Sequence, residues 1–129
     1  MIKFVGTYFL YNGGEIMAEK LHPDMPNQED MNFMLWYRIY LLHKSGREYV
    51  NIKYAYDLLG ELFGLSDEQR NYQTNSGENE WEAKVRSSYA YLKKHNIIKS
   101  DPSKDGDWCL TENGIKKIEE FIPPTVTFQ

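Results

Sequence analysis

The sequence has a single cysteine, Cys109, so one chain cannot form a disulfide with itself. Its three histidines, His22, His43 and His95, do not fall at metal-ligand spacing from one another or from that cysteine. These shortages exclude a disulfide-stapled scaffold and a zinc module of ordinary spacing. They fit a reducing compartment, so we expect a cytoplasmic protein with neither a metal nor another cofactor.

A long apolar run is also missing. The apolar stretch at residues 1–11 breaks at Asn12-Gly13-Gly14, which makes it too short to span a membrane, and it lacks a small-residue cleavage site. We therefore expect a soluble protein without a membrane partner, and no pattern indicates a small-molecule substrate.

The bulk composition indicates one globular domain. The chain has 129 residues, of which 41% are hydrophobic and 15% aromatic, enough to bury one core. We divide it into an N-terminal arm or extension at residues 1–28, a folded domain at residues 29–122 and a tail at residues 123–129. The initial methionine favours a complete chain.

The chain has no excess of positive charge. Its net charge of −4 and isoelectric point near 5.4 speak against a polyanionic partner. The charge is unevenly distributed along the chain, because residues 79–104 carry six basic side chains against three acidic ones. The basic side chains are Lys84, Arg86, Lys93, Lys94, Lys99 and Lys104.

Three helices are predicted before this basic region. Residues 29–44 contain no breaker and are apolar on nearly every face, which is typical of a buried helix. Asn51 is a good N-cap for a helix over residues 52–63. Ser66 begins a capping box that predicts a short helical turn.

The basic region begins with a helix over residues 80–96, between Asn79 as N-cap and Asn96 as C-cap. Its helical spacing separates two sides. The side expected to face the core holds Trp81, Val85, Ser88, Tyr89 and Leu92. The opposite side holds Glu80, Ala83, Ser87 and Lys94, flanked by Lys84 and Tyr91.

Short strands and a final helix complete the prediction. Residues 48–50 favour a strand, and residues 97–99 and 108–110 favour a hairpin whose tip is rich in turn residues. Thr111 caps a helix over residues 112–121. This order predicts a mainly α (α+β) fold, a winged helix-turn-helix with a C-terminal helix and an N-terminal extension.

Four runs carry a family resemblance. They are LGELFGLSDEQR at residues 59–70, Ser76-Gly77, the run ending in YLKKHNII at residues 81–98, and WCLTENG at residues 108–114. In this order the chain resembles the N-terminal domains of Mrr-type restriction systems over about residues 30–120. The resemblance implies a winged helix that reads duplex DNA.

The chain departs from that family at two pairs. Ala83-Lys84 stands where the family has Asn-Arg, and Ser87-Ser88 stands where it has Trp-Ala. Without the asparagine, a side chain able to make a bidentate contact to adenine is missing. The resemblance therefore implies a docking mode and no particular base sequence.

A recognition helix in the major groove needs small or polar residues on its open face and cations at its edges and on the hairpin. The phosphate-contacting candidates are Lys84, Lys94, Lys99 and Lys104, and the candidates for base-edge or methyl contacts are Ser87 and Tyr91. Each lysine could instead only solvate a helix face, and Tyr91 could pack against the hairpin.

Two short runs match the residue types of a nuclease motif, but their expected positions do not form a nuclease site. Pro23-Asp24 and Glu82-Ala83-Lys84 imitate the metal-dependent nuclease pattern, but Glu82 and Lys84 would lie in the first turns of a helix and point to different sides. We therefore expect no enzyme.

The sequence favours a non-catalytic protein that binds double-stranded DNA. It could be a transcription regulator that acts as a homodimer, joined by the N-terminal arm or by the aromatic-rich first helix. Alternatively, it could be a protein-interaction module or a DNA mimic, since the rest of the chain is acidic.

Overall fold

The computed structural model describes residues 23–104 and 106–122. The expected tail at residues 123–129, and all of the expected arm except residues 23–28, lie outside these residues. The elements in chain order are α1 (Gln28–Lys44), β1 (Val50–Asn51), α2 (Ile52–Leu62), α3 (Asp67–Asn71), α4 (Glu80–Lys94), β2 (Ile98–Ser100), β3 (Asp107–Leu110) and α5 (Glu112–Phe121). None of these helices is both long and apolar enough to cross a membrane.

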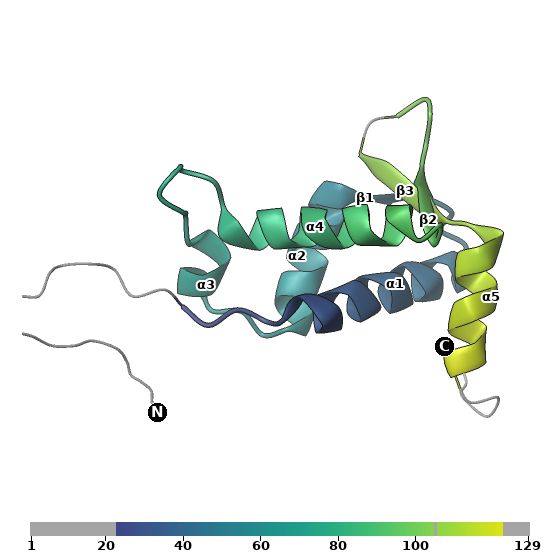
Figure 1. Ribbon diagram of the computed structural model, residues 1–129, viewed down its shortest axis with the longest axis horizontal. Coiled ribbons are helices and arrows are strands. Elements are labelled where there is room, and N and C mark those ends of the chain that lie inside the picture. The colour runs from purple at the N-terminus through teal and green to yellow at the C-terminus, as the bar shows by residue number, and fades with distance from the viewer. Residues whose placement is uncertain (1–22, 105, 123–129) are drawn as a thin grey trace, which may run out of the picture.

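The fold is mostly helical with one small antiparallel sheet, as the α+β prediction required. The three strands lie in the order β1-β3-β2, and β2 and β3 form a hairpin that protrudes beyond one end of α4 (Figure 1). The first strand, predicted at residues 48–50, is Val50–Asn51 instead. Its position follows from the partner strand, because Val50 pairs with Trp108 and the Asn51 side chain donates to Asp107 Oδ1 at 2.6 Å.

Local capping sets the helix starts. The side chains of Asn51, Ser66, Asn79 and Thr111 each accept a hydrogen bond from a backbone N–H of the following turn, as predicted. The end of α4 differs from the prediction, since the helix stops at Lys94 and His95 is its C-cap. Asn96 follows with φ of 61°, a left-handed conformation that asparagine tolerates better than most residues.

The core is built around α4. Trp81, Val85 and Leu92 are fully buried and Tyr89 is nearly so, as the helical spacing predicted. The remaining buried apolar side chains come from every other element except α3, among them Met31, Leu35 and Ile39 of α1, Val50 of β1, Ala55 and Leu59 of α2, Ile98 of β2, Leu110 of β3 and Ile118 of α5. Burial of this continuous apolar surface is the main favourable term in folding.

A polar bond crosses the packed interface between α1 and α4. Ser88 is completely buried, and its Oγ accepts a hydrogen bond of 2.8 Å from Gln28 Nε2. The same Gln28 nitrogen donates to the carbonyl oxygen of Lys84 at 3.0 Å. Gln28 therefore satisfies a hydroxyl that would otherwise be buried without a partner.

The start of α5 lies unusually close to the start of β2. A Cβ atom built on Gly114 would collide with the backbone carbonyl of Ile97, so the close approach requires glycine. Trp36 of α1 donates through Nε1 to the carbonyl oxygen of Gly114 at 3.0 Å. This one glycine thus lets α5 contact both the hairpin and α1.

Two glycine-to-alanine changes in helices should have opposite effects on stability. Gly114→Ala must displace the Ile97 backbone, and we expect it to lower the free energy of unfolding by about 1–3 kcal/mol. Gly60→Ala meets only ordinary contacts, the nearest being Trp81 Nε1 at 3.6 Å. It should raise the free energy of unfolding by roughly 0.5–1 kcal/mol through helix propensity. Urea unfolding measures both, and an unchanged Gly114→Ala protein would contradict the close approach.

Candidate nucleic-acid interface

The side of α4 opposite its buried residues is open to solvent. Ser87, Ala90 and Lys94 are exposed on this outer face, and Tyr91 is 45% exposed at its margin. A helix that buries one side and presents small and cationic residues on the other has the dimensions and chemistry that the DNA major groove accepts. Ser87 and Lys94, both predicted as contact residues, lie together on this outer face.

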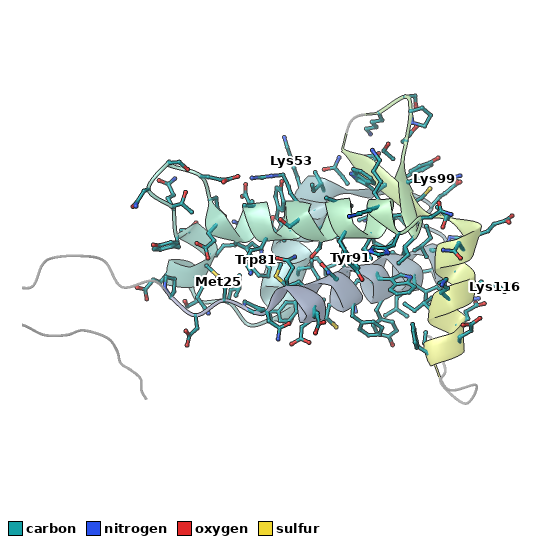
Figure 2. The ribbon with its side chains drawn as sticks, viewed as in Figure 1. Met25, Lys53, Trp81, Tyr91, Lys99 and Lys116 are labelled. Atoms are coloured by element: carbon teal, nitrogen blue, oxygen red, sulfur yellow. The ribbon has the colours of Figure 1, made fainter. Side chains whose placement is uncertain are left out.

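The two other predicted α4 residues lie on the edge of the helix that is nearer α1. Lys84 is only half-exposed, and its carbonyl oxygen accepts the hydrogen bond from Gln28 of α1. The Tyr91 ring lies 4.3 Å, centroid to centroid, from the ring of His95. Figure 2 shows Tyr91 on the α1 side of α4, away from the hairpin. The ring contact of Tyr91 is thus with the C-cap residue of its own helix, His95.

The two lysines of the hairpin, Lys99 and Lys104, lie in different places. Successive residues of a strand point to opposite faces of a sheet, and Trp108 points toward α4, where its ring lies 5.1 Å from that of Tyr89. Lys99 pairs in register with Cys109, the residue after Trp108, so it lies on the sheet face that points away from α4. Lys104 stands near the tip with a 70% exposed side chain, 3.8 Å from Asp107 Oδ2.

Two cations that were not among the predicted contacts line the hairpin side of α4. Arg86 and Lys93 are exposed and seven residues apart, a spacing that places them on one edge of the helix. The Lys93 ammonium lies 5.7 Å from the centre of the Trp108 ring, so it spans α4 and the hairpin. Figure 2 shows the exposed Lys53 of α2 on this side of α4 as well. The seven-residue spacing of Arg86 and Lys93 was the sequence signal that could have found this edge.

Ion pairs engage two carboxylates near the start of α4, Glu78 and Glu82. Arg70 of α3 lies 3.1 Å from both Glu82 and Asp57. Arg86 donates to Glu78 at 2.5 Å and to the Tyr56 hydroxyl at 3.2 Å. The bond to Tyr56, reinforced by Glu78, raises the pKa of Arg86, so this guanidinium stays charged but is already engaged.

The cations near the C-terminal end of α4 are freer. Within the described residues, the structure gives Lys93 and Lys94 no carboxylate partner within ion-pair distance. The cations available to a phosphate are therefore those of the last turn of α4, whereas Lys104 of the hairpin lies close to a carboxylate.

The nuclease-like letters do not come together as a metal site. Glu82 and Lys84 are on α4 as predicted, and the Glu82 carboxylate is occupied by Arg70. Among residues 23–104 and 106–122, no group of three or more His, Cys, Asp or Glu side chains is placed to hold a metal ion. Burial is the main cause that raises the pKa of the Cys109 thiol, which favours the protonated, weakly nucleophilic form.

The comparisons with known proteins identify one relationship. A family model described as the Mrr N-terminal domain matches residues 39–120, which is more than half of the chain and includes α2, α3, α4 and the hairpin. No curated protein and no solved structure matches the chain.

Two buried tyrosines predict a loss of stability in alkali. Burial raises the pKa of Tyr40 to about 12, helped by its hydrogen bond of 2.8 Å to Glu119, and burial also raises the pKa of Tyr89. In the unfolded chain both phenols ionise near pH 10, while the folded protein still holds their protons. Their contribution to stability is therefore complete below pH 10 and is lost as the pH rises toward 12.

Phenylalanine substitutions separate these two tyrosines. The Tyr89 hydroxyl is buried without a hydrogen-bond partner among the described residues, so Tyr89→Phe should leave neutral-pH stability unchanged or raise it by up to about 1 kcal/mol. Tyr40→Phe loses the bond to Glu119 and should cost about 1 kcal/mol. Both variants should lose less stability in alkali than the parent. Urea unfolding at neutral and alkaline pH tests this, and an equal loss in all three proteins would contradict it.

Proposed function

Because the chain belongs to the family of Mrr N-terminal domains, which is associated with restriction systems, we propose that it is a winged-helix domain that binds double-stranded DNA without catalysing a reaction. The topology supports this proposal. A helix, a short strand, three helices and a hairpin follow one another, and the strand order β1-β3-β2 puts β2 of the hairpin at the sheet edge, in contact with α4. In this arrangement α4 is the recognition helix and the β2-β3 hairpin is the wing.

The observation that carries the proposal is the open outer face of α4 beside a protruding hairpin (Figure 1). The width of the major groove of B-DNA admits an α-helix, and a neighbouring hairpin can then lie along the adjacent backbone. Ser87 and Ala90 are small enough to let the helix axis approach the base edges. No other surface of the described residues combines a helix of small residues with cations at its end and a projecting strand pair.

The charge distribution explains how an acidic chain can bind a polyanion. The carboxylates Glu78 and Glu82 near the start of α4 are neutralised by arginines, whereas Lys93 and Lys94 at its end are free of such pairs among the described residues. Counterion release from a few phosphate contacts supplies most of the affinity for DNA, and it depends on the local cations rather than on the net charge.

We assign the proposed DNA contacts from the position of each side chain on α4 and on the hairpin. Lys94, Lys99 and Lys104 would bind phosphates, from the end of α4, the outer face of the hairpin and the tip of the wing respectively. Ser87 would face base edges and Tyr91 would reach a thymine methyl group or a modified base from the margin of the helix. Lys84, which is half-buried against α1, would contribute least.

The absence of catalysis is part of the proposal. It is supported by the placement of Glu82 in a helix with Arg70 as its partner, which removes the carboxylate that the nuclease letters require.

The net charge of −4 favours one rival function, a protein-interaction module or DNA mimic with a cationic partner. Fluorescence polarisation against a mixed duplex pool, with and without methylated cytosine, distinguishes the two. DNA binding through several lysines should weaken steeply as salt rises, with a slope of about −0.9 in the double-logarithmic plot for each phosphate contacted. Flat polarisation traces at low salt would reject the DNA proposal and support the rival one.

Alanine substitutions of lysine locate the interface. Lys94→Ala should weaken duplex binding severalfold and reduce the salt slope by about 1, because it removes one phosphate contact. Lys84→Ala should change affinity by less than about twofold, because that side chain lies at the α1 edge. Lys116→Ala, an exposed lysine that Figure 2 labels on α5 and that is outside the proposed contacts, is the matched control and should bind like the parent. Equal losses in all three variants would indicate non-specific charge attraction instead.

A further inference from the structure

A second surface remains uncovered in the described residues. Phe33 is 42% exposed and Phe121 is 65% exposed, unusual values for such large apolar side chains. Trp36 joins them, because its ring centre lies 6.4 Å from that of Phe33 and 6.0 Å from that of Phe121, and Phe33 stacks on Tyr37 at 6.0 Å. We call these four residues the aromatic strip. Two of the four rings are exposed and two are partly buried, and a contiguous, partly exposed aromatic surface of this kind is typical of an interaction site.

The strip faces away from the proposed DNA surface. Met31, Leu35 and Ile39 form the buried side of α1, which packs on the core and on α4. Phe33 and Tyr37 fall on the opposite side of the helix by its 3.6-residue period. In Figure 1 α5 lies beside one end of α1. A partner on the strip would therefore leave the outer face of α4 open.

Charges at the two ends of α1 give this surface a polarity. The first turn holds Glu29 and Asp30, and the last turn holds Lys44. Asp30, Tyr37 and Lys44 are spaced by seven residues, so they lie on one side of α1. The exposed side of α1 thus runs from acidic through aromatic to basic.

We propose that the aromatic strip binds a second copy of this chain, with the two α1 helices antiparallel across a two-fold axis. A two-fold contact repeats each interaction, so the Asp30 carboxylate would face Lys44 of the partner subunit twice. A parallel arrangement would place like charges together at both ends. The polarity of the surface is therefore complementary to itself in the antiparallel arrangement alone, and this inference does not depend on DNA binding.

The proposed pairing has a definite register. Asp30 and Lys44 are about 21 Å apart along α1 at 1.5 Å per residue, and Tyr37 lies midway between them. The two-fold axis would therefore pass at Tyr37, with the tyrosine of each copy against that of the other. Phe33 would then face Leu41 of the partner subunit, a half-buried apolar residue.

Charge reversal tests the pairing on the full chain by sedimentation velocity over a range of concentrations. The parent should show a reversible monomer–dimer equilibrium. Asp30→Lys or Lys44→Asp alone should raise the dimer dissociation constant by about tenfold, because each puts like charges together twice. The double variant should regain most of the parent affinity. If the substitutions acted only by placing unfavourable charges at the ends of α1, the double variant would form the weakest dimer. That result would overturn the pairing.

Cysteine crosslinking tests the register independently. The native Cys109 is buried, so an engineered thiol on α1 is the reactive one. Tyr37→Cys at the axis should form a disulfide-linked dimer under mild oxidation, since a disulfide requires Cα atoms within about 7 Å. The matched control Asp30→Cys should not crosslink, because its symmetry mate would be about 21 Å away along the helix.

The outcomes of these tests are distinct from those of the DNA experiment. A parent chain that stays monomeric at the highest soluble concentration overturns the proposal, and a different protein or another segment of this chain then becomes the occupant of the strip. Crosslinking of Asp30→Cys but not of Tyr37→Cys overturns it as well. Dimerisation without duplex binding would support this inference while rejecting the proposed function.

Discussion

The complete burial of one side of α4 is the constraint on which the rest of the structure depends. Trp81 is the largest side chain with no exposure, and its indole N–H donates to the carbonyl oxygen of Tyr56 at 2.9 Å, so α4 is fixed to α2 by packing and by a hydrogen bond. Gln28 fixes the same helix to α1 through Ser88. Because these contacts fix α4 to two neighbouring helices, its opposite side is presented from a rigid support, as a binding surface requires.

The sequence predicted the helices well and the strands less well, for a physical reason. Helix starts depend on side chains within one turn, and Asn51, Ser66, Asn79 and Thr111 act as caps whatever surrounds them. A two-residue strand has almost no signal of its own. The position of β1 is set by pairing of Val50 with Trp108, which lies 58 residues away in the chain, so local preference at residues 48–50 could not place it.

The candidate site was predictable where it depends on helical spacing, and it was not predictable where it depends on contacts between distant segments. Helical spacing correctly assigned Ser87 and Lys94 to the open face of α4 and Trp81, Val85 and Leu92 to the buried one. It could not show that Lys99 points away from α4, because that depends on which face of the hairpin Trp108 occupies. Nor could it show which carboxylates are neutralised, since the pairs of Arg70 with Asp57 and Glu82 join three separate helices.

The two proposed surfaces are connected through the start of α5. The indole N–H of Trp36, in the aromatic strip, donates to the carbonyl oxygen of Gly114, and Gly114 lies directly against the backbone of Ile97 at the base of the hairpin. Thr111 completes the junction, because its hydroxyl donates to the carbonyl oxygen of Asn96 at 2.6 Å. Interiors packed this closely transmit displacement rather than absorbing it. The contacts at Gly114 therefore hold the base of the hairpin and Trp36 together, so the aromatic strip and the hairpin share one packed junction.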